Sequence, residues 1–476
     1  MSNVTFDISV KLIKNKLRMK NTFKGIYWVL TAVVMCISCN LLDVEKIDNL
    51  NDASLDSVTK DASRVQIDQL GYGVQFAMRA SYYDFSWIAG SIGRECIIFN
   101  STDTRYYTEL LGASTINPSG IFFGWYTSFS ASRRRAEVFM SSANNTINLT
   151  PEEKSACVGY GKTVQAFSML NCLNMMPDVG IRIDVADVTN PGPFVPYADG
   201  LIYCKKLVDE GAAALDKGSA KFPFTLAAGY AGFSTPADFK KFNRAVAARI
   251  AMFQKDWAGM NTALSASFLN PAGNLATGPQ FNFSTIAGDV SNAFFLPYTS
   301  TAPICIQRSL TTDAEAGDKR VFGTSVRDGG VAKIRARTAI GLLGIPASTF
   351  EFQPVTSNTS SMSIIRNEEL LLMSAEAKAQ TGDLVGAITA LDTVRVRNGL
   401  SILATAKPTV IGNKDRIITE VLNQRRYSLL LEGGHRWFDM RRYNLLATLP
   451  KDLATHNVFN SFPKPQAEVD WDNRPK

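Results

Sequence analysis

The segment "RNEELLLMSAEAKAQTGDLVGAITALDTVRV", residues 366–396, indicates the fold more clearly than any other part of the chain. Apolar and small residues fill its first half, and Leu384 and Leu391 recur at helical spacing in its second half. Between the halves, Gly382 can take the left-handed conformation that ends a helix, and Asp383 can cap the next helix. The segment therefore predicts a helix hairpin of the tetratricopeptide type, in which alanines allow close approach of the two helices.

The same pattern recurs elsewhere and predicts a mostly α protein. Further helix pairs are expected at residues 242–267 with a break at 255–256, at 153–176 with 198–218, and near 415–446. Two segments, at about 71–130 and 268–360, are rich in glycine, small polar residues and aromatics, and are expected to be irregular. Irregular segments on a rigid scaffold commonly carry binding function, so the ligand site is expected in that part of the chain.

The overall composition fits a folded globular protein, with 46% hydrophobic and 20% charged residues among 476. The formal charge of +7 is concentrated at the N-terminus, because residues 1–38 carry six basic side chains against one acidic side chain. The rest of the chain therefore has a charge of only about +2, which argues against a nucleic-acid partner.

The N-terminus has the features of a secretory signal peptide over residues 1–38, with a basic stretch followed by the apolar run "GIYWVLTAVVMCIS". That run is too short for a permanent membrane span, which takes about 20 residues. Cys39 follows in the sequence "CISC", which resembles a bacterial lipobox, and we expect this thiol to be acylated and to anchor the protein in a membrane. Met19 is a plausible translation start. Residues 39–60 are polar and suit a tether to a single folded domain over 61–476.

The five cysteines that follow Cys39 in the chain point to neither a disulfide framework nor a metal centre. They are widely spaced and odd in number, and no CxxC pair occurs among them. Cys157, Cys172 and Cys204 lie in apolar helical segments and are expected to be buried thiols. No motif for a metal or a cofactor is present, so neither is predicted.

The segment "LLLEGGHRWFDMRRYN", residues 429–444, is the strongest candidate for catalytic chemistry. It places His435 close to Glu432 and Asp439, and two such carboxylates could serve a glycoside hydrolase. The alternative is a structural ion-pair network beside buried aromatics, in which Arg436 and Asp439 can pair on one helical face. We favour the structural network and predict no catalytic residue.

Several longer motifs resemble the SusD/RagB family. The C-terminal ones are "IIRNEELLLMSAEAKAQTGD", "VLNQRRYSLLLEGGHRWFDMRRYN" and "FPKPQAEVDWDN", and the N-terminal ones are "NLLDVE", "FGWYTSFSASRRRAEVFM" and "GYGKTVQAFSMLNCLNMMPDVGI". The resemblance implies tetratricopeptide-like helix pairs packed against an irregular, loop-rich half that holds the ligand. It also implies a non-catalytic lipoprotein on the surface of the outer membrane in Bacteroidota. Such a protein captures a nutrient, commonly a glycan, and passes it to a SusC-like TonB-dependent barrel.

Aromatic side chains in the N-terminal irregular region are the predicted binding residues. A flat aromatic ring matches the apolar face of a sugar, and Tyr82, Tyr83, Trp87, Tyr106 and Tyr107 lie where family members often place such rings. A peptide could use the same surface, so peptide cargo for the same kind of transporter stays an alternative. A secreted glycoside hydrolase is a further alternative, which would require two essential carboxylates.

Overall fold

The structure, a computed structural model, describes residues 55–80, 82–187, 189–297, 299–322 and 333–474. Residues Val58–Lys476 form one compact unit. The predicted signal peptide, the alternative start Met19, Cys39 and most of the predicted tether lie outside the described residues. Among the residues that are described, no helix combines the length and the hydrophobicity that crossing a membrane requires.

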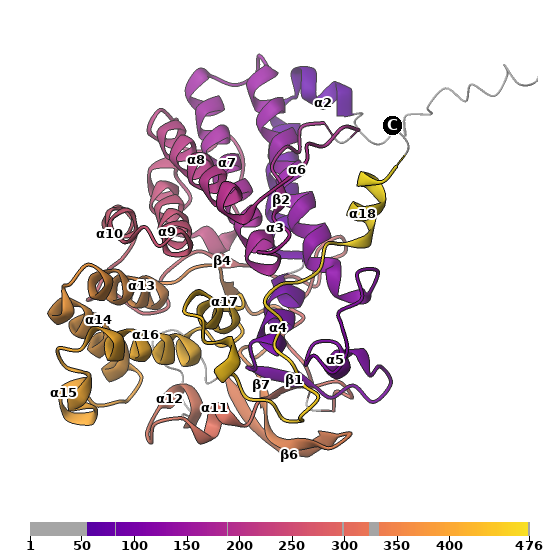
Figure 1. The fold of residues 1–476 in the computed structure, drawn as a ribbon. Coiled ribbons are helices and arrows are strands. Elements are labelled where there is room, and N and C mark those ends of the chain that lie inside the picture. The colour runs from indigo at the N-terminus through magenta and orange to yellow at the C-terminus, as the bar shows by residue number, and fades with distance from the viewer. Residues whose placement is uncertain (1–54, 81, 188, 298, 323–332, 475–476) are drawn as a thin grey trace, which may run out of the picture. The chain divides into compact units, whose positions relative to one another are not determined.

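Helices dominate the unit and fall into two groups along the chain (Figure 1). The N-terminal group contains α2 (Leu55–Asp61), α3 (Arg64–Ala80), α4 (Tyr82–Ile92), α5 (Arg105–Thr108), α6 (Gly124–Asn145), α7 (Pro151–Met175), α8 (Tyr197–Asp216), α9 (Pro236–Gln254) and α10 (Trp257–Ser265). The C-terminal group contains α11 (Ser309–Thr312), α12 (Lys319–Phe322), α13 (Asn367–Gln380), α14 (Leu384–Arg397), α15 (Leu403–Ala406), α16 (Lys414–Ser428), α17 (His435–Arg442) and α18 (Gln466–Asp472). Single 3-10 turns occur at Ile121–Phe123, Ala228–Tyr230, Pro408–Val410 and Leu446–Thr448.

Strands form one small sheet and two short ribbons. They are β1 (Cys96–Ile98), β2 (Ile181–Arg182), β3 (Phe194–Val195), β4 (Gln280–Phe281), β5 (Ile304–Ile306), β6 (Ile334–Leu342), β7 (Ile345–Phe352) and β8 (Met362–Ser363). The sheet has the antiparallel order β1-β5-β7-β6, and the ribbons pair β2 with β3 and β4 with β8. The strands β4 to β7 all come from the predicted irregular segment 268–360, which otherwise contains only short helices.

The predicted helix hairpins are present, and their turns use the expected residues. Gly382 has a φ of 93°. The carboxylate of Asp383 accepts a hydrogen bond of 2.8 Å from the backbone N–H of Gly386 and thereby caps the first turn of α14. In the hairpin of α9 and α10, Lys255 takes the left-handed conformation, and Asp256 caps α10. Consecutive helices from α6 to α10 pack on one another, and α10 contacts α13, which joins the two helix groups.

The largest core cluster lies under α3 to α10 and includes Trp125 and Trp437, both fully buried. A second cluster fills the space between α13, α14 and α16. The predicted buried thiols Cys157, Cys172 and Cys204 all lie in the first cluster, which confirms that prediction.

The prediction of an irregular segment at 71–130 was wrong for much of its length, because α3, α4 and α6 occupy it. Its small residues mark close helix packing, which local sequence does not distinguish from a loop. A Cβ atom at Gly71 in α3 would lie 2.7 Å from the ring of Phe224, and one at Gly90 in α4 would lie 2.1 Å from the side chain of Leu431. These glycines therefore allow the helices to approach their neighbours.

Candidate functional site

The predicted binding aromatics lie mostly in the protein interior. Tyr82, Trp87 and Tyr107 are only 2%, 4% and 3% exposed, while Tyr83 and Tyr106 are partly buried. Trp87 stacks on Tyr106 with a centroid distance of 5.4 Å, and its indole N–H donates to the Asp84 carboxylate at 3.1 Å. The ring edge of Tyr83 packs on Phe294.

The structure therefore brings Tyr83, Trp87 and Tyr106 together but not as an open stacking surface. Tyr107 belongs to a separate cluster beside the sheet, together with Ile97 and Phe99. The rings of Tyr82, Trp87 and Tyr107 are buried, so their faces are covered by protein atoms and offer no surface to a sugar. Ligand binding by the partly exposed Tyr83 and Tyr106 stays a prediction.

The His435 segment forms a buried ion-pair network. Asp439 accepts hydrogen bonds of 2.7 Å from both Arg425 and Arg442, and Arg442 also bonds Glu376 at 2.7 Å. The suggested pairing of Asp439 with Arg436 was wrong, because Asp439 faces Arg425 of α16 across the helix contact. Burial, and after it the charge of Arg425, holds the pKa of His435 well below its ordinary value, so the ring is neutral at pH 7.

The second carboxylate of this segment is also held by cations. Glu432 forms ion pairs with Lys333 and with Arg366. Both carboxylates are therefore fixed in the interior by basic side chains, as the structural interpretation requires. Metal binding finds no support either, since no cluster of three or more potential ligands occurs in the part of the chain that the structure describes.

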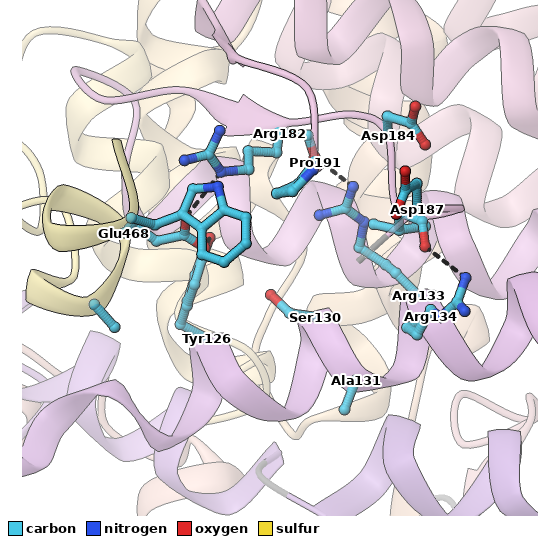
Figure 2. Close-up of a pocket in the computed structure, with 13 residues that line it drawn as sticks. Tyr126, Ser130, Ala131, Arg133, Arg134, Arg182, Asp184, Asp187, Pro191 and Glu468 are labelled. Carbon is cyan, nitrogen blue, oxygen red and sulfur yellow. Dashed lines mark hydrogen bonds and ion pairs between the residues drawn. The ribbon is translucent and has the colours of Figure 1, made fainter. Parts of the chain in front are cut away.

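A pocket of about 370 Å³ lies where α6, the segment that follows β2, and α18 meet (Figure 2). A volume of this size lies in the range of pockets for small ligands, about 300–1,000 Å³. The pocket is lined by Tyr126, Ser130, Ala131, Arg133, Arg134, Arg182, Asp184, Val185, Asp187, Pro191, Ala467, Glu468 and Trp471. Its three walls come from segments that are far apart in the sequence.

Arginines of the "SRRRAE" motif build one wall of this pocket. Arg133 donates to the backbone carbonyls of Arg182 and Ile183, and Arg134 donates to those of Val185 and Ala186. The two guanidinium groups thereby hold the segment 182–186 along α6. These side chains therefore tie a loop to the scaffold.

The opposite wall is fixed through Arg182. Its guanidinium bonds the carboxylates of Glu468 at 2.8 Å and of Asp472, both on α18. The hydroxyl of Tyr126 donates to the other oxygen of Glu468 at 2.7 Å (Figure 2). These contacts place α18 against α6 and bring Trp471 to the pocket.

Trp471 is the partly exposed aromatic of this pocket, and the sequence analysis did not select it. The guanidinium of Arg474 lies 3.6 Å from the centroid of its ring, which restricts ligand contact to the other ring face. A signal was present in the sequence, because Pro465 precedes a short run compatible with a helix. The sequence did not show which residues this helix contacts.

A second hollow of about 370 Å³ adjoins the first on the other side of the 183–186 segment. It shares Arg133, Asp184 and Val185 with the first pocket and adds Glu137, Gln165, Met169, Ile183, Ala186, Tyr203 and Leu207. The Arg133 side chain thus lines both spaces. Together the two spaces offer an aromatic face, several apolar side chains, and both hydrogen-bond donors and acceptors.

Comparison with known proteins identifies the fold. Residues 312–476 match the model of the SusD family. No curated protein matches the chain. Among solved structures, a SusD superfamily protein from Bacteroides vulgatus is similar, with a TM-score of 0.62 and 16% identity, covering 86% of this chain and 97% of that chain.

Two further similar structures have names that state a ligand. Surface glycan-binding protein A from Bacteroides uniformis has a TM-score of 0.62 and 16% identity, over 84% of this chain and 98% of that chain. A laminarin binding SusD-like protein has a TM-score of 0.57 and 15% identity, over 84% of this chain and 96% of that chain. The C-terminal segment thus matches the SusD family model, and the chain shares its fold with SusD-like proteins over most of its length.

Proposed function

We propose that this protein is a cell-surface lipoprotein that binds an oligosaccharide without cleaving it and delivers it to a SusC-like TonB-dependent transporter. The observation that carries the proposal is the pocket between α6 and α18 on a fold shared with proteins named as glycan-binding. The signal sequence and the lipobox-like Cys39 support an anchored position on the outer membrane.

The chemistry of the pocket suits a saccharide. A pyranose ring presents an apolar face of C–H groups, which can lie on Trp471, while its hydroxyl groups need donors and acceptors around the rim. Ser130, Asp184 and Asp187 supply such groups, and Pro191 and Ala131 add apolar surface. Asp187 is ionised at neutral pH, because hydrogen bonds from Thr189, and after them the charge of Arg134, lower its pKa.

The state of the His435 segment supports binding without cleavage. Glycoside hydrolysis needs two carboxyl groups facing the scissile bond in an accessible cleft. In the candidate catalytic segment, Glu432 and Asp439 are buried and paired with basic side chains. The ligand is therefore expected to leave the protein chemically unchanged.

The test is a calorimetric binding screen of the full chain, purified in a detergent that contains no sugar, against a panel of oligosaccharides and peptides. We expect at least one glycan to bind and no new reducing ends to appear. Trp471→Ala should weaken binding about tenfold or more, because the contact with a sugar ring depends on a flat apolar face. Trp257→Ala is the matched control, since Trp257 is also partly buried but lies on α10, outside the pocket.

Binding of peptides alone would contradict the proposal and favour peptide cargo. Release of reducing ends would favour the hydrolase. Delivery is tested separately by co-purification with a SusC-like barrel from the native membrane, and loss of uptake in a strain that retains the barrel but lacks this protein would support it.

A further inference from the structure

The Arg133 guanidinium differs from the other charged groups of the pocket. Arg182 is paired with Glu468, and Arg134 faces Asp187, whose pKa it helps to lower. Arg133 forms no ion pair with any carboxylate among the described residues, although its side chain is only 2% exposed. A buried cation without a counter-ion is costly, because little solvent remains to stabilise its charge.

The hydrogen bonds of Arg133 leave part of its donor capacity unused. Only Nη2 donates, to the carbonyls of Arg182 and, at 3.2 Å, of Ile183. Nε and Nη1 donate to no protein acceptor among the described residues. Neither atom is sealed in the interior, so both are open to the cavity. Figure 2 shows the Arg133 side chain reaching from α6 into the space below the 182–191 segment.

Arg94 shows what a purely structural buried arginine looks like in this protein. It is 1% exposed and has no carboxylate bonded to it, but all three of its nitrogens donate to carbonyl oxygens. Among these, Nε bonds Pro450 and Nη2 bonds Leu111 and Asn457. A guanidinium whose three nitrogens all donate to protein carbonyls needs no ligand. In Arg133 only Nη2 donates to the protein.

The acidic side chains near the pocket do not replace the missing counter-ion. Glu137, one turn further along α6, also lines the adjoining hollow, but it accepts from Gln165 at 2.9 Å and forms no ion pair with Arg133. Asp184 and Asp187 are exposed at the rim, where water screens their charge, and Oδ1 of Asp184 accepts from the backbone N–H of Ala186 at 2.9 Å. Burial lowers the pKa of Arg133, and the groups that act on it next are the thiol of Cys172 and the phenol of Tyr126 rather than carboxylates. The charge of Arg133 thus acts in a low-dielectric site and outweighs the exposed rim charges.

We propose that the pocket between α6 and α18 binds an acidic saccharide, and that the free N–H donors of the Arg133 guanidinium receive the carboxylate of that sugar. This inference rests on the proposed function and specifies its substrate class as a glycan that contains uronic acid or another carboxylated sugar. Each free N–H of the guanidinium can donate a charge-assisted hydrogen bond to a carboxylate oxygen. Trp471 on the other side of the pocket favours a sugar over an acidic peptide, because it provides a flat surface for the ring.

The experiment compares ligands that differ only in charge, using the full chain in a detergent that contains no sugar. The probes are trigalacturonic acid against its methyl ester, 3′-sialyllactose against lactose, and a short polyglutamate peptide. The native protein should bind at least one acid about tenfold or more tightly than its neutral partner, and this preference should weaken as the salt concentration rises.

Arg133→Gln should abolish the preference for the acid, and Arg133→Lys should retain part of it. Arg135→Gln is the matched control, because Arg135 lies on the same helix but is exposed, donates to the backbone carbonyl of Gly73 and does not line the pocket. It should keep the preference within about threefold. If Arg133→Gln fails to fold, the comparison of acid and neutral ligands on the native protein still decides the question.

Each other outcome overturns the inference. Equal binding of acid and neutral forms, or an acid preference that survives in folded Arg133→Gln, leaves the proposed glycan-binding function standing but removes the acidic substrate class. Binding of polyglutamate with no binding of any saccharide overturns both proposals, and so does the absence of saccharide binding across the panel.

Discussion

Replacing Asp439 by Asn tests the energetic role of the buried network around His435. The Asp439 side chain is 2% exposed and bonds Arg425, 1% exposed, and Arg442. In Asp439→Asn, Arg442 keeps Glu376 as a partner, whereas Arg425 keeps only the ring nitrogen of His435 among these neighbours. Removing one partner of a buried pair costs about 3–5 kcal/mol, and we expect a loss near the lower end because one of the two arginines stays paired.

The measurement is urea unfolding followed by circular dichroism at pH 7, with extrapolation to water. Asp103→Asn is the matched control, since Asp103 pairs with the largely exposed Arg105 on the surface and should change the free energy of unfolding far less. A loss below about 1 kcal/mol for Asp439→Asn would refute the reasoning that this network stabilises the fold.

The pH dependence gives an independent check on the same residue. Although burial acts to raise it, the charges of Arg425 and Arg442 lower the pKa of Asp439 overall. A carboxylate with a depressed pKa in the folded state stabilises the protein above its unfolded pKa of about 3.9, and that stabilisation is lost as the pH falls through the folded value. The difference between native protein and Asp439→Asn should therefore shrink below about pH 4. A difference that stays constant down to pH 2 would contradict the ion-pair explanation.

Two further predictions concern the scaffold. Asp383→Ala removes the side-chain cap that bonds the Gly386 N–H and should cost about 1 kcal/mol of unfolding free energy, measured by urea unfolding; no loss would show that the cap is dispensable. Burial raises the pKa of Glu95 to about 8, although Arg436 acts to lower it. Because the folded state holds this proton and the unfolded state releases it near pH 4.3, Glu95 destabilises the protein increasingly between about pH 4.3 and the folded pKa. Glu95→Gln should therefore raise Tm at pH 8 and leave it nearly unchanged at pH 5, and equal Tm values at pH 8 would contradict the prediction.

The helix hairpins could be predicted because the signals that form them are local. In the segment 366–396, apolar spacing sets the two helices, and Gly382 and Asp383 set the turn, all within one stretch of chain. The break at Lys255–Asp256 and the burial of the three helical cysteines follow from equally short-range patterns. The motifs that resemble the SusD/RagB family are continuous as well, and this is why the resemblance is visible in the sequence alone.

The aromatic prediction shows where local reasoning ends. Tyr82, Trp87 and Tyr107 look the same in the sequence whether their rings face solvent or the core. Their burial depends on packing against distant residues, such as Phe281 beside Tyr82 and Phe122 beside Trp87. In the same way, the glycines of α3 and α4 resemble loop residues until the neighbours they accommodate are known.

The sequence by itself determined the helix pairs and their turns, and it carries motifs that resemble the SusD/RagB family. Only the tertiary structure decided the pocket, because its walls come from residues 126–134, 182–191 and 467–471, which no sequence spacing relates. It also decided that Arg133 lies buried without a carboxylate partner while the adjacent Arg134 faces one. The physical reason is that burial and charge pairing are set by long-range contacts, whereas helix formation and capping are set by neighbours along the chain.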